Sequence, residues 1–327
     1  MKKNIPLLTV VILCTICLIG CSSSGSGASD ASGLKIVTTI FPEYDWVMNV
    51  LGDNPADIEV TMLLENGVDL HSFQPTVDDI LKISSCDMFV YVGGESDKWV
   101  EDALKEAANK DMIVIDLLDV LGDSAKEEET VEGMQEEDHD HQEDESDETE
   151  YDEHVWLSLK NAVSFTEVIS KAVQELDPDH AGLYRSNSVS YTEKLNALDV
   201  SYLSAVSGAP VRTVLFADRF PFRYLTEDYG LDYYAAFSGC SAETEASFET
   251  ITFLARKTDE LSLPAVLTIE GTDHRIAETI LSNTRNGDLK ILTMDSMQAV
   301  TSKDVSEGTT YISIMENNLE VLKEALY

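Results

Sequence analysis

Two histidines and one aspartate occupy positions from which they could bind a divalent metal ion. His71 lies in a polar loop after an apolar run, His154 stands where an acidic stretch gives way to an apolar one, and Asp295 follows another apolar run. Neutral imidazole nitrogens and a carboxylate oxygen suit Zn(II), or Mn(II) where oxygen ligands dominate. Each residue alone is a weak indication, because a single loop histidine is more often a surface residue than a ligand.

The elements expected around these residues alternate between strand and helix. Short apolar runs alternate with amphipathic stretches in both halves of the chain, which is typical of parallel α/β layers. Strands are expected at 34–39, 58–64, 87–92, 112–116, 211–216, 231–237, 265–269 and 290–294. Helices are expected at 44–51, 77–84, 97–108, 158–176, 180–207, 221–228, 247–261 and 274–282.

This alternation predicts two α/β lobes, each a mostly parallel sheet with flanking helices. The first lobe is expected at 34–177 and the second at 209–327, with a long interdomain helix at 178–208 between them. In parallel sheets ligands bind beyond the carboxyl ends of the strands, so the three candidate ligands are expected to meet in a cleft between the lobes.

The start of the chain indicates export. A basic Met1-Lys2-Lys3 precedes an apolar run that ends in Leu18-Ile19-Gly20-Cys21. This is the pattern of a bacterial lipobox, so residues 1–20 are interpreted as a signal peptide and Cys21 as the lipid-modified residue, with ordinary secretion or a plain membrane anchor as the alternative. Residues 21–33 would form a flexible tether at the outer face of the cell membrane.

Composition and charge restrict the partners. Apolar residues make up 43% of the chain, and the formal charge of -39 excludes nucleic acid and anionic lipid as electrostatic partners and favours cations. Residues 127–153 include 16 acidic residues among 27, so we expect a disordered acidic loop at 124–153. Its His139 and His141 either collect metal weakly or belong to a solvated spacer. We expect a monomer.

Beyond the signal peptide and the lipid-modified Cys21, two cysteines remain. Cys86 and Cys240 could form one disulfide in an exported protein, but a single pair makes no disulfide framework. We expect two buried single cysteines.

Four motifs and the long helix resemble a known family. GVDLHSFQPT, DEHVWLSLKNA, FRYLTEDYGL and LTMDSM are similar, in order and spacing, to the zinc- and manganese-binding lipoproteins of bacterial ABC importers. This is the TroA-like cluster that includes the ZnuA and AdcA proteins. The resemblance implies a two-lobed solute-binding protein that holds one divalent metal ion and passes it to a membrane permease with its ATPase. It also implies that His71, His154 and Asp295 are metal ligands.

One position departs from the family pattern. The family's third ligand is a histidine or glutamate, and Arg219 stands at that position in this sequence. A guanidinium has no free lone pair and cannot bind metal. We favour the adjacent Asp218 as the completing ligand, and Arg219 is then a residue that orients a metal-binding carboxylate, or one side of a structural salt bridge. Glu270, His274 and water are further possibilities.

A thiolate from Cys240 would favour zinc, although the corresponding family loop carries no ligand. Glu270 is also considered as a residue supporting the ligands.

Zinc is the expected metal and Mn(II) the alternative. Zinc outranks manganese at nearly any site of this composition, and the acidic loop with His139 and His141 resembles the zinc-importing branch of the family. A zinc hydrolase would also use two histidines and a carboxylate, but the sequence contains no H-E-x-x-H motif. The interpretation as a surface adhesin would be supported only by the membrane anchor and the acidic composition. We therefore expect a binding protein and no enzyme.

Overall fold

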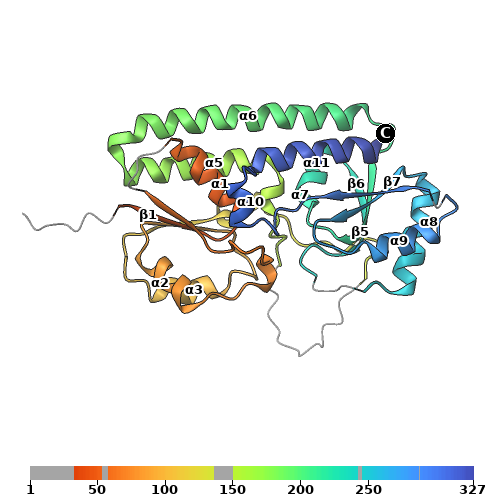
Figure 1. The fold of residues 1–327 in the computed structure, drawn as a ribbon, viewed down its shortest axis with the longest axis horizontal. Helices are drawn as coiled ribbons and strands as arrows, with labels where there is room; N and C mark the ends of the chain where they lie inside the picture. The colour runs from red at the N-terminus through yellow and green to blue at the C-terminus, as the bar shows by residue number, and fades with distance from the viewer. Residues whose placement is uncertain (1–32, 54–57, 136–149, 242–244, 287) are drawn as a thin grey trace, which may run out of the picture. The chain divides into compact units, whose positions relative to one another are not determined.

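Two four-stranded sheets, both entirely parallel, carry the two expected lobes (Figure 1). The first has the order β2-β1-β3-β4 and consists of β1 (Lys35–Thr38), β2 (Glu59–Met62), β3 (Met88–Tyr91) and β4 (Ile113–Asp116). The second has the order β6-β5-β7-β8 and consists of β5 (Thr213–Arg219), β6 (Asp232–Phe237), β7 (Ala265–Ile269) and β8 (Lys290–Met294). The predicted α/β class is confirmed.

The structure is a computed structural model, and it describes residues 33–53, 58–135, 150–241, 245–286 and 288–327. The expected signal peptide, Cys21 and the tether up to residue 32 lie outside the described residues, as do His139 and His141. Across the described ranges, no helix combines the length and the apolar character that crossing a membrane requires.

The first half of the chain contains the helices α1 (Phe41–Leu51), α2 (Val77–Ser85), α3 (Trp99–Lys105), α4 (Leu117–Leu121) and α5 (Leu159–Leu176), with 3-10 turns η1 (Leu70–Ser72), η2 (Gly122–Ser124), η3 (Val155–Leu157) and η4 (Pro178–His180). The remaining helices are α6 (Ala181–Gly208), α7 (Arg223–Tyr229), α8 (Phe248–Leu261), α9 (Arg275–Ser282), α10 (Ser302–Ser306) and α11 (Tyr311–Leu326).

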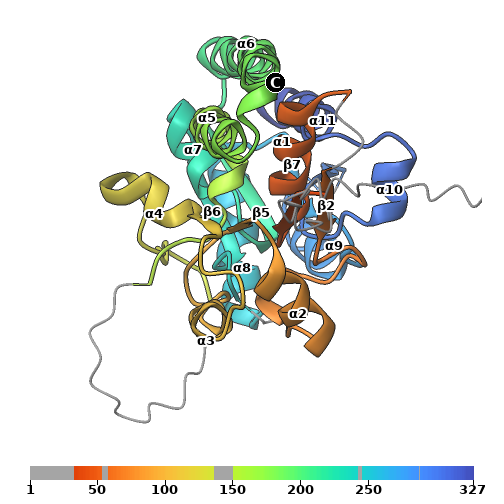
Figure 2. The same cartoon turned by 90° about the vertical axis from the view of Figure 1, so that its left-hand side faces the viewer.

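The predicted long helix is α6, with 28 residues. It packs along α5, as both views show, and contacts α1, α7 and α11 as well (Figures 1 and 2). Tyr184, Tyr191, Leu195 and Tyr202 are buried along it at helical spacing, so apolar packing holds α6 against its neighbours.

The helix α11 was not among the expected elements. Thr310 caps its start by accepting a hydrogen bond from the Ser313 amide, and Tyr311, Met315 and Leu319 are buried at helical spacing. It packs against β8 and β7 of the second sheet and against α1, which follows the first strand of the first sheet. The Tyr311 hydroxyl donates to the Trp156 carbonyl (2.6 Å). The C-terminal helix therefore joins the two sheets as α6 does.

The acidic stretch is ordered at both ends, which corrects the expected disordered loop at 124–153. Residues 126–128 pair with residues 150–152: the Glu128 amide donates to the Glu150 carbonyl (2.9 Å), and the Asp152 amide donates to the Lys126 carbonyl (2.8 Å). Gln135 is also fixed, because its amide donates to the Ala236 carbonyl (2.9 Å). Backbone pairing thus overrides the composition at these positions, and Asp152 and Glu153 are buried.

A buried aspartate in α1 makes stability depend on pH. Asp45 accepts hydrogen bonds from the Tyr191 hydroxyl and the Asn49 side-chain amide (both 2.9 Å). Burial, only partly offset by these bonds, raises the pKa of Asp45 from 3.8 to about 6. The folded protein holds this proton more tightly than the unfolded chain, so Asp45 contributes stability below about pH 4 that is lost as the pH rises through about 6.

We expect Asp45→Asn to remove this loss. Two pKa units correspond to about 3 kcal/mol. When the pH is raised from about 4 to about 7.5, wild type should therefore lose up to that amount of unfolding free energy through Asp45, and the variant should not. Urea unfolding at both pH values measures the change, with the exposed Asp53→Asn as the control. A difference that stays constant with pH would contradict the assignment.

Candidate metal centre

The two candidate histidines face each other, and each presents its Nε2 atom to the other ring. The Nε2 atoms of His71 and His154 lie 3.2 Å apart. His71 belongs to η1, which Asp69 caps by accepting the His71 amide (3.0 Å), and its side chain is 13% exposed. His154 directly precedes η3 and is fully buried. Two nitrogens bound to one tetrahedral Zn(II) lie about 3.3 Å apart, so this separation fits a shared ion.

The outer nitrogens of both rings contact acceptors. His71 Nδ1 lies 2.8 Å from Ser96 Oγ and 3.3 Å from Glu153 Oε2, and His154 Nδ1 lies 3.0 Å from Asp152 Oδ1. These carboxylates assign the ring protons to Nδ1, which leaves a lone pair on each Nε2. Two lone pairs facing each other repel unless a cation lies between them. Carboxylates that hold the far side of histidine rings are typical of protein metal sites.

Glu153 is held as an ion. Burial alone would raise its pKa, but hydrogen bonds with the His71 side chain and with the Ser96 side chain and amide bring the pKa below its ordinary value. The Ser96 amide donates to Glu153 Oε1 at 2.8 Å. Gly94 makes this approach possible, because a Cβ at that residue would lie 2.5 Å from the same oxygen.

Asp152 is fixed from the second lobe. Its carbonyl accepts a hydrogen bond from the Tyr224 hydroxyl (3.1 Å) at the start of α7, and that hydroxyl accepts the Lys126 amide (2.9 Å). The Asp152 carboxylate accepts the His154 amide (2.9 Å) in addition to the imidazole. The ring of His154 is therefore oriented by a residue that both halves of the chain hold in place.

A third metal-ligating side chain lies beside the two rings. One ring nitrogen each from His71 and His154 and the Sγ of Cys240 all lie within 4.8 Å of one another. Cys240 is in the loop that follows β6, and its surroundings include Glu128, Asp152 and Glu153; burial and then these three charges raise the pKa of its thiol. Both Cys86 and Cys240 are unpaired, but only Cys86 is fully buried, so the expectation of two buried cysteines is wrong for Cys240.

Arg219 forms an ion pair close to the site. Its guanidinium donates to Asp69 Oδ2 (2.8 Å), and Asp69 Oδ1 accepts the His71 amide. Burial would raise the pKa of Asp69, but the charge of Arg219 and the hydrogen bonds from Arg219 and the His71 amide lower it. Arg219 at the end of β5 thus supports the turn that carries His71.

The structure does not bring Asp218 and Asp295 into the group formed by the two histidines and Cys240. Asp218 accepts the Arg219 amide (2.9 Å) and interacts with Thr272 and the Ile269 backbone of its own lobe. Asp295 accepts the Met297 amide (2.7 Å). The ligand roles of Asp218 and Asp295 stay predictions.

Two other predicted residues lie in the loops that follow β7. Glu270 accepts hydrogen bonds from the Ser296 amide (2.7 Å) and hydroxyl (2.6 Å), so it ties its loop to the one that carries Asp295. Burial and the charge of Glu270 raise the pKa of Asp295 to about 6. His274 lies 3.5 Å from the Thr293 hydroxyl and is not part of the histidine and cysteine group.

Sequence reasoning missed Ser96, Asp152 and Glu153, and it considered Cys240 only as a thiolate that would favour zinc. A signal existed for two of them, since Asp152 and Glu153 immediately precede His154, and an acidic residue next to a metal-binding histidine is a common support. For Ser96 and Cys240 only the tertiary structure shows the contact.

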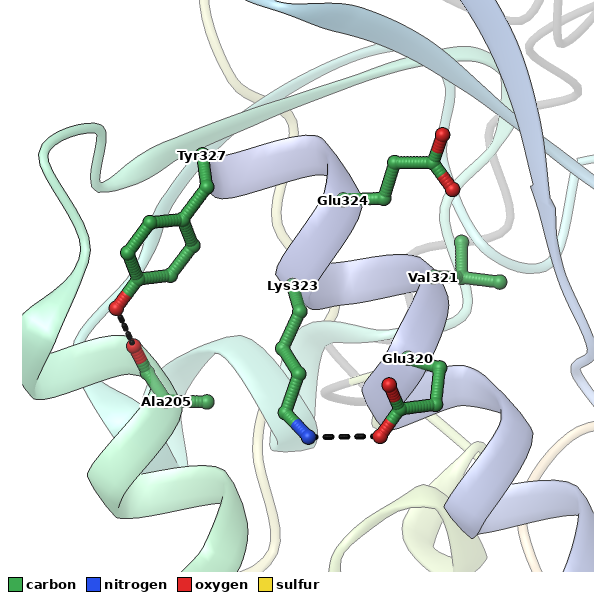
Figure 3. A pocket seen from close by; sticks show the side chains of 6 residues that line it. All are labelled: Ala205, Glu320, Val321, Lys323, Glu324 and Tyr327. Carbon is green, nitrogen blue, oxygen red and sulfur yellow. Dashed lines mark hydrogen bonds and ion pairs between the residues drawn. The ribbon is translucent and has the colours of Figure 1, made fainter.

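A hollow of about 610 Å³ lies elsewhere, on the surface between α6 and α11. Ala205, Glu320, Val321, Lys323, Glu324 and Tyr327 line it (Figure 3). The Tyr327 hydroxyl donates to the Ala205 carbonyl (3.1 Å), and Lys323 pairs with Glu320 (2.7 Å). Because its lining contains no histidine or cysteine, we do not interpret it as a transition-metal site.

Comparison with known proteins agrees with these features. The zinc-binding lipoprotein AdcA of Streptococcus pneumoniae serotype 4 is 32% identical over 328 residues, which are 98% of this chain and 61% of that protein. AdcA of Streptococcus pyogenes serotype M6 is 27% identical over 294 residues, 89% of this chain and 55% of that protein. The chain thus spans little more than half the length of the AdcA proteins. The high-affinity zinc uptake system protein ZnuA of Bacillus subtilis is 28% identical over 324 residues, 98% of this chain and 97% of that protein.

Solved structures show the same fold. The Zn(II)-bound ZnuA-like domain of Streptococcus pneumoniae AdcA has a TM-score of 0.70 at 28% identity, with 90% of this chain and 99% of that chain covered. The metal-dependent lipoprotein YcdH of Bacillus subtilis has a TM-score of 0.71 at 26% identity, with the same shares covered.

Two parallel α/β lobes joined by one long helix, with the candidate ligands in loops at the strand ends, define a two-lobed solute-binding protein. The chain belongs to the ZnuA family, described as zinc-uptake complex component A periplasmic, whose model matches residues 36–325. This family consists of binding components of uptake systems and not of enzymes.

Proposed function

We propose that this protein captures one Zn(II) ion through His71 and His154 and delivers it to the permease of an ABC importer. The observation that carries the proposal is the pair of Nε2 atoms 3.2 Å apart, with both Nδ1 atoms occupied by hydrogen-bonding partners. A cation is the natural occupant between two imidazole lone pairs.

The burial of the site supports a carrier. His154 is fully buried and His71 is largely covered, so an ion held here is shielded from solvent and from competing ligands. Arg219 and Asp69 form an ion pair between the two lobes beside the ligands, and the Trp156 indole donates to the Ser296 carbonyl (2.9 Å) across the same boundary. Release to a permease would then require these contacts to open.

Zinc is the proposed metal and manganese is the alternative. Imidazole ligands suit zinc, and zinc binds more tightly than manganese at nearly all sites with nitrogen ligands. Support comes also from the relatives: the two AdcA proteins are named as zinc-binding, and ZnuA of Bacillus subtilis is named as a protein of a zinc uptake system. Export and lipidation at Cys21 complete the proposal, because two of the similar proteins are named as lipoproteins and the sequence Leu18-Ile19-Gly20-Cys21 has the lipobox pattern.

Metal stoichiometry tests this function. We expect one tightly held zinc ion per chain after exchange into metal-free buffer, measured by elemental analysis, and zinc should displace manganese when both are offered in equal amounts. A variant lacking residues 136–149, and with them His139 and His141, should retain the same single ion and lose only weakly bound metal. A protein that retains no ion, or that prefers manganese, would contradict the proposal.

A further inference from the structure

We propose that Cys240 supplies the third ligand, through its thiolate, and that the site is therefore a His2Cys zinc centre. This inference rests on the metal-binding function proposed above and identifies a ligand of that same site. The Sγ of Cys240 and one ring nitrogen of each histidine lie within 4.8 Å of one another, which is the spacing of three side chains around one ion.

The loop that carries Cys240 lies directly against the imidazole ring of His154. Gly239 is buried, and a Cβ at that position would lie 2.9 Å from His154 Cε1, 3.0 Å from His154 Nδ1 and 2.9 Å from the Phe220 carbonyl oxygen. Any larger residue would push the loop away from the ring. The absence of a side chain at Gly239 thus allows the next residue, Cys240, to reach the histidines.

Backbone contacts fix the same loop. The Cys240 amide lies 3.4 Å from Glu128 Oε1, and the Ser241 amide donates to the Ser238 carbonyl (3.4 Å). Glu128 belongs to the segment whose pairing with residues 150–152 also holds Asp152. The cysteine and the second histidine are therefore positioned by one connected piece of structure.

Charge and ligand chemistry favour a metal at this sulfur. Glu128, Asp152 and Glu153 place negative charge around Cys240, and a divalent cation would balance that charge as well as that of the thiolate. The guanidinium of Arg219 is paired with Asp69 (2.8 Å). Because thiolates bind zinc strongly and suit manganese poorly, Cys240 would increase the preference for zinc. A tetrahedral ion bound by two histidines and one cysteine accepts one more ligand, and Asp295 stays the predicted residue for that position.

Cobalt(II) is a direct probe of the inference, because a thiolate bound to Co(II) produces a sulfur-to-metal charge-transfer band in the near ultraviolet. We expect the full chain loaded with one Co(II) to show this band. Cys240→Ser should lose the band and bind zinc roughly tenfold more weakly, since removal of a ligand costs at least as much as the loss of a supporting residue. It should also discriminate less between zinc and manganese.

Cys86→Ser is the matched control, because Cys86 is an unpaired cysteine in the first lobe whose sulfur contacts the Ile83 carbonyl (3.2 Å). This variant should keep both the band and the affinity. Cobalt bound by wild type without a sulfur band, or a band that persists in Cys240→Ser, would overturn the inference alone. Failure of wild type and Cys86→Ser to bind any cobalt would overturn the proposed function together with it.

Discussion

Replacing His154 by alanine is expected to weaken zinc binding by roughly a hundredfold or more. Loss of a supporting residue at a metal site typically costs 10-fold to 100-fold in affinity, and His154 is proposed to bind the ion directly. The change also removes the imidazole that hydrogen-bonds to the buried Asp152 carboxylate (3.0 Å). Competition against a chromophoric zinc chelator measures the affinity.

His180 provides the control for this experiment. It is an exposed histidine on η4, hydrogen-bonded to Asp177 (2.7 Å), and we expect His180→Ala to leave zinc affinity unchanged. His71→Ala should behave like His154→Ala, because the two rings contribute equivalent nitrogens. Wild-type affinity in both His71→Ala and His154→Ala would exclude this pair as the zinc site. Circular dichroism of each variant separates a lost ligand from a lost fold.

The architecture could be predicted from the sequence because it depends on local patterns. Apolar runs marked all eight strands of the two sheets to within a few residues, and the helical spacing along α6 marked the interdomain helix. The helix α11 is not among the expected helices, although the sequence contains its signals: Thr310 is a capping residue, and apolar residues recur through Leu326 at helical spacing. The helix α3 begins at Trp99 and not at Asp97, because the Asp97 carboxylate accepts the amides of Val92 and Gly93 (both 3.1 Å).

The histidine pair could be predicted from the sequence, but its surroundings could not. His154 stood out because the buried Val155, Trp156 and Leu157 follow it. By residue type Glu153 is one more carboxylate of the acidic stretch. Its position, however, depends on contacts with Ser96 and Gly94, which are distant in sequence. Composition averages over a window of residues, so it could not separate Glu153 from the residues before it.

The role of Cys240 depends on a contact that no local pattern encodes. Its approach to His154 requires Gly239 to lie against the imidazole ring, and that depends on how β6 and η3 are placed in the fold. Arg219 illustrates the same limit. The sequence shows that an arginine cannot be a ligand, but only the structure shows that its partner is Asp69.

Trp156 connects the site to the packing of both lobes. Its ring is 1% exposed and lies 5.2 Å from the His154 ring, centroid to centroid. Its indole N–H donates to the Ser296 carbonyl, next to Asp295, and its own carbonyl accepts the Tyr311 hydroxyl. One side chain therefore backs a proposed ligand and fixes a loop of the second sheet.

We expect Trp156→Ala to lower the free energy of unfolding by about 3–5 kcal/mol, the range typical of removing a large aromatic ring from a core. Zinc affinity should fall as well, because the His154 ring loses the surface that holds it in place. Urea unfolding of the metal-free protein and zinc competition measure the two effects separately.

Two further variants divide the effect of Trp156 into its causes. Trp156→Phe keeps most of the ring but removes the donor to Ser296, so a smaller loss of about 1–3 kcal/mol is expected from the unsatisfied carbonyl.

Trp99→Ala removes a partly exposed indole on α3 that packs against Phe73, and it should cost less than Trp156→Ala and leave zinc affinity unchanged. Equal losses in Trp156→Ala and Trp99→Ala would contradict a special role for Trp156, because burial, the contact with His154 and the hydrogen bond to Ser296 are what distinguish its side chain.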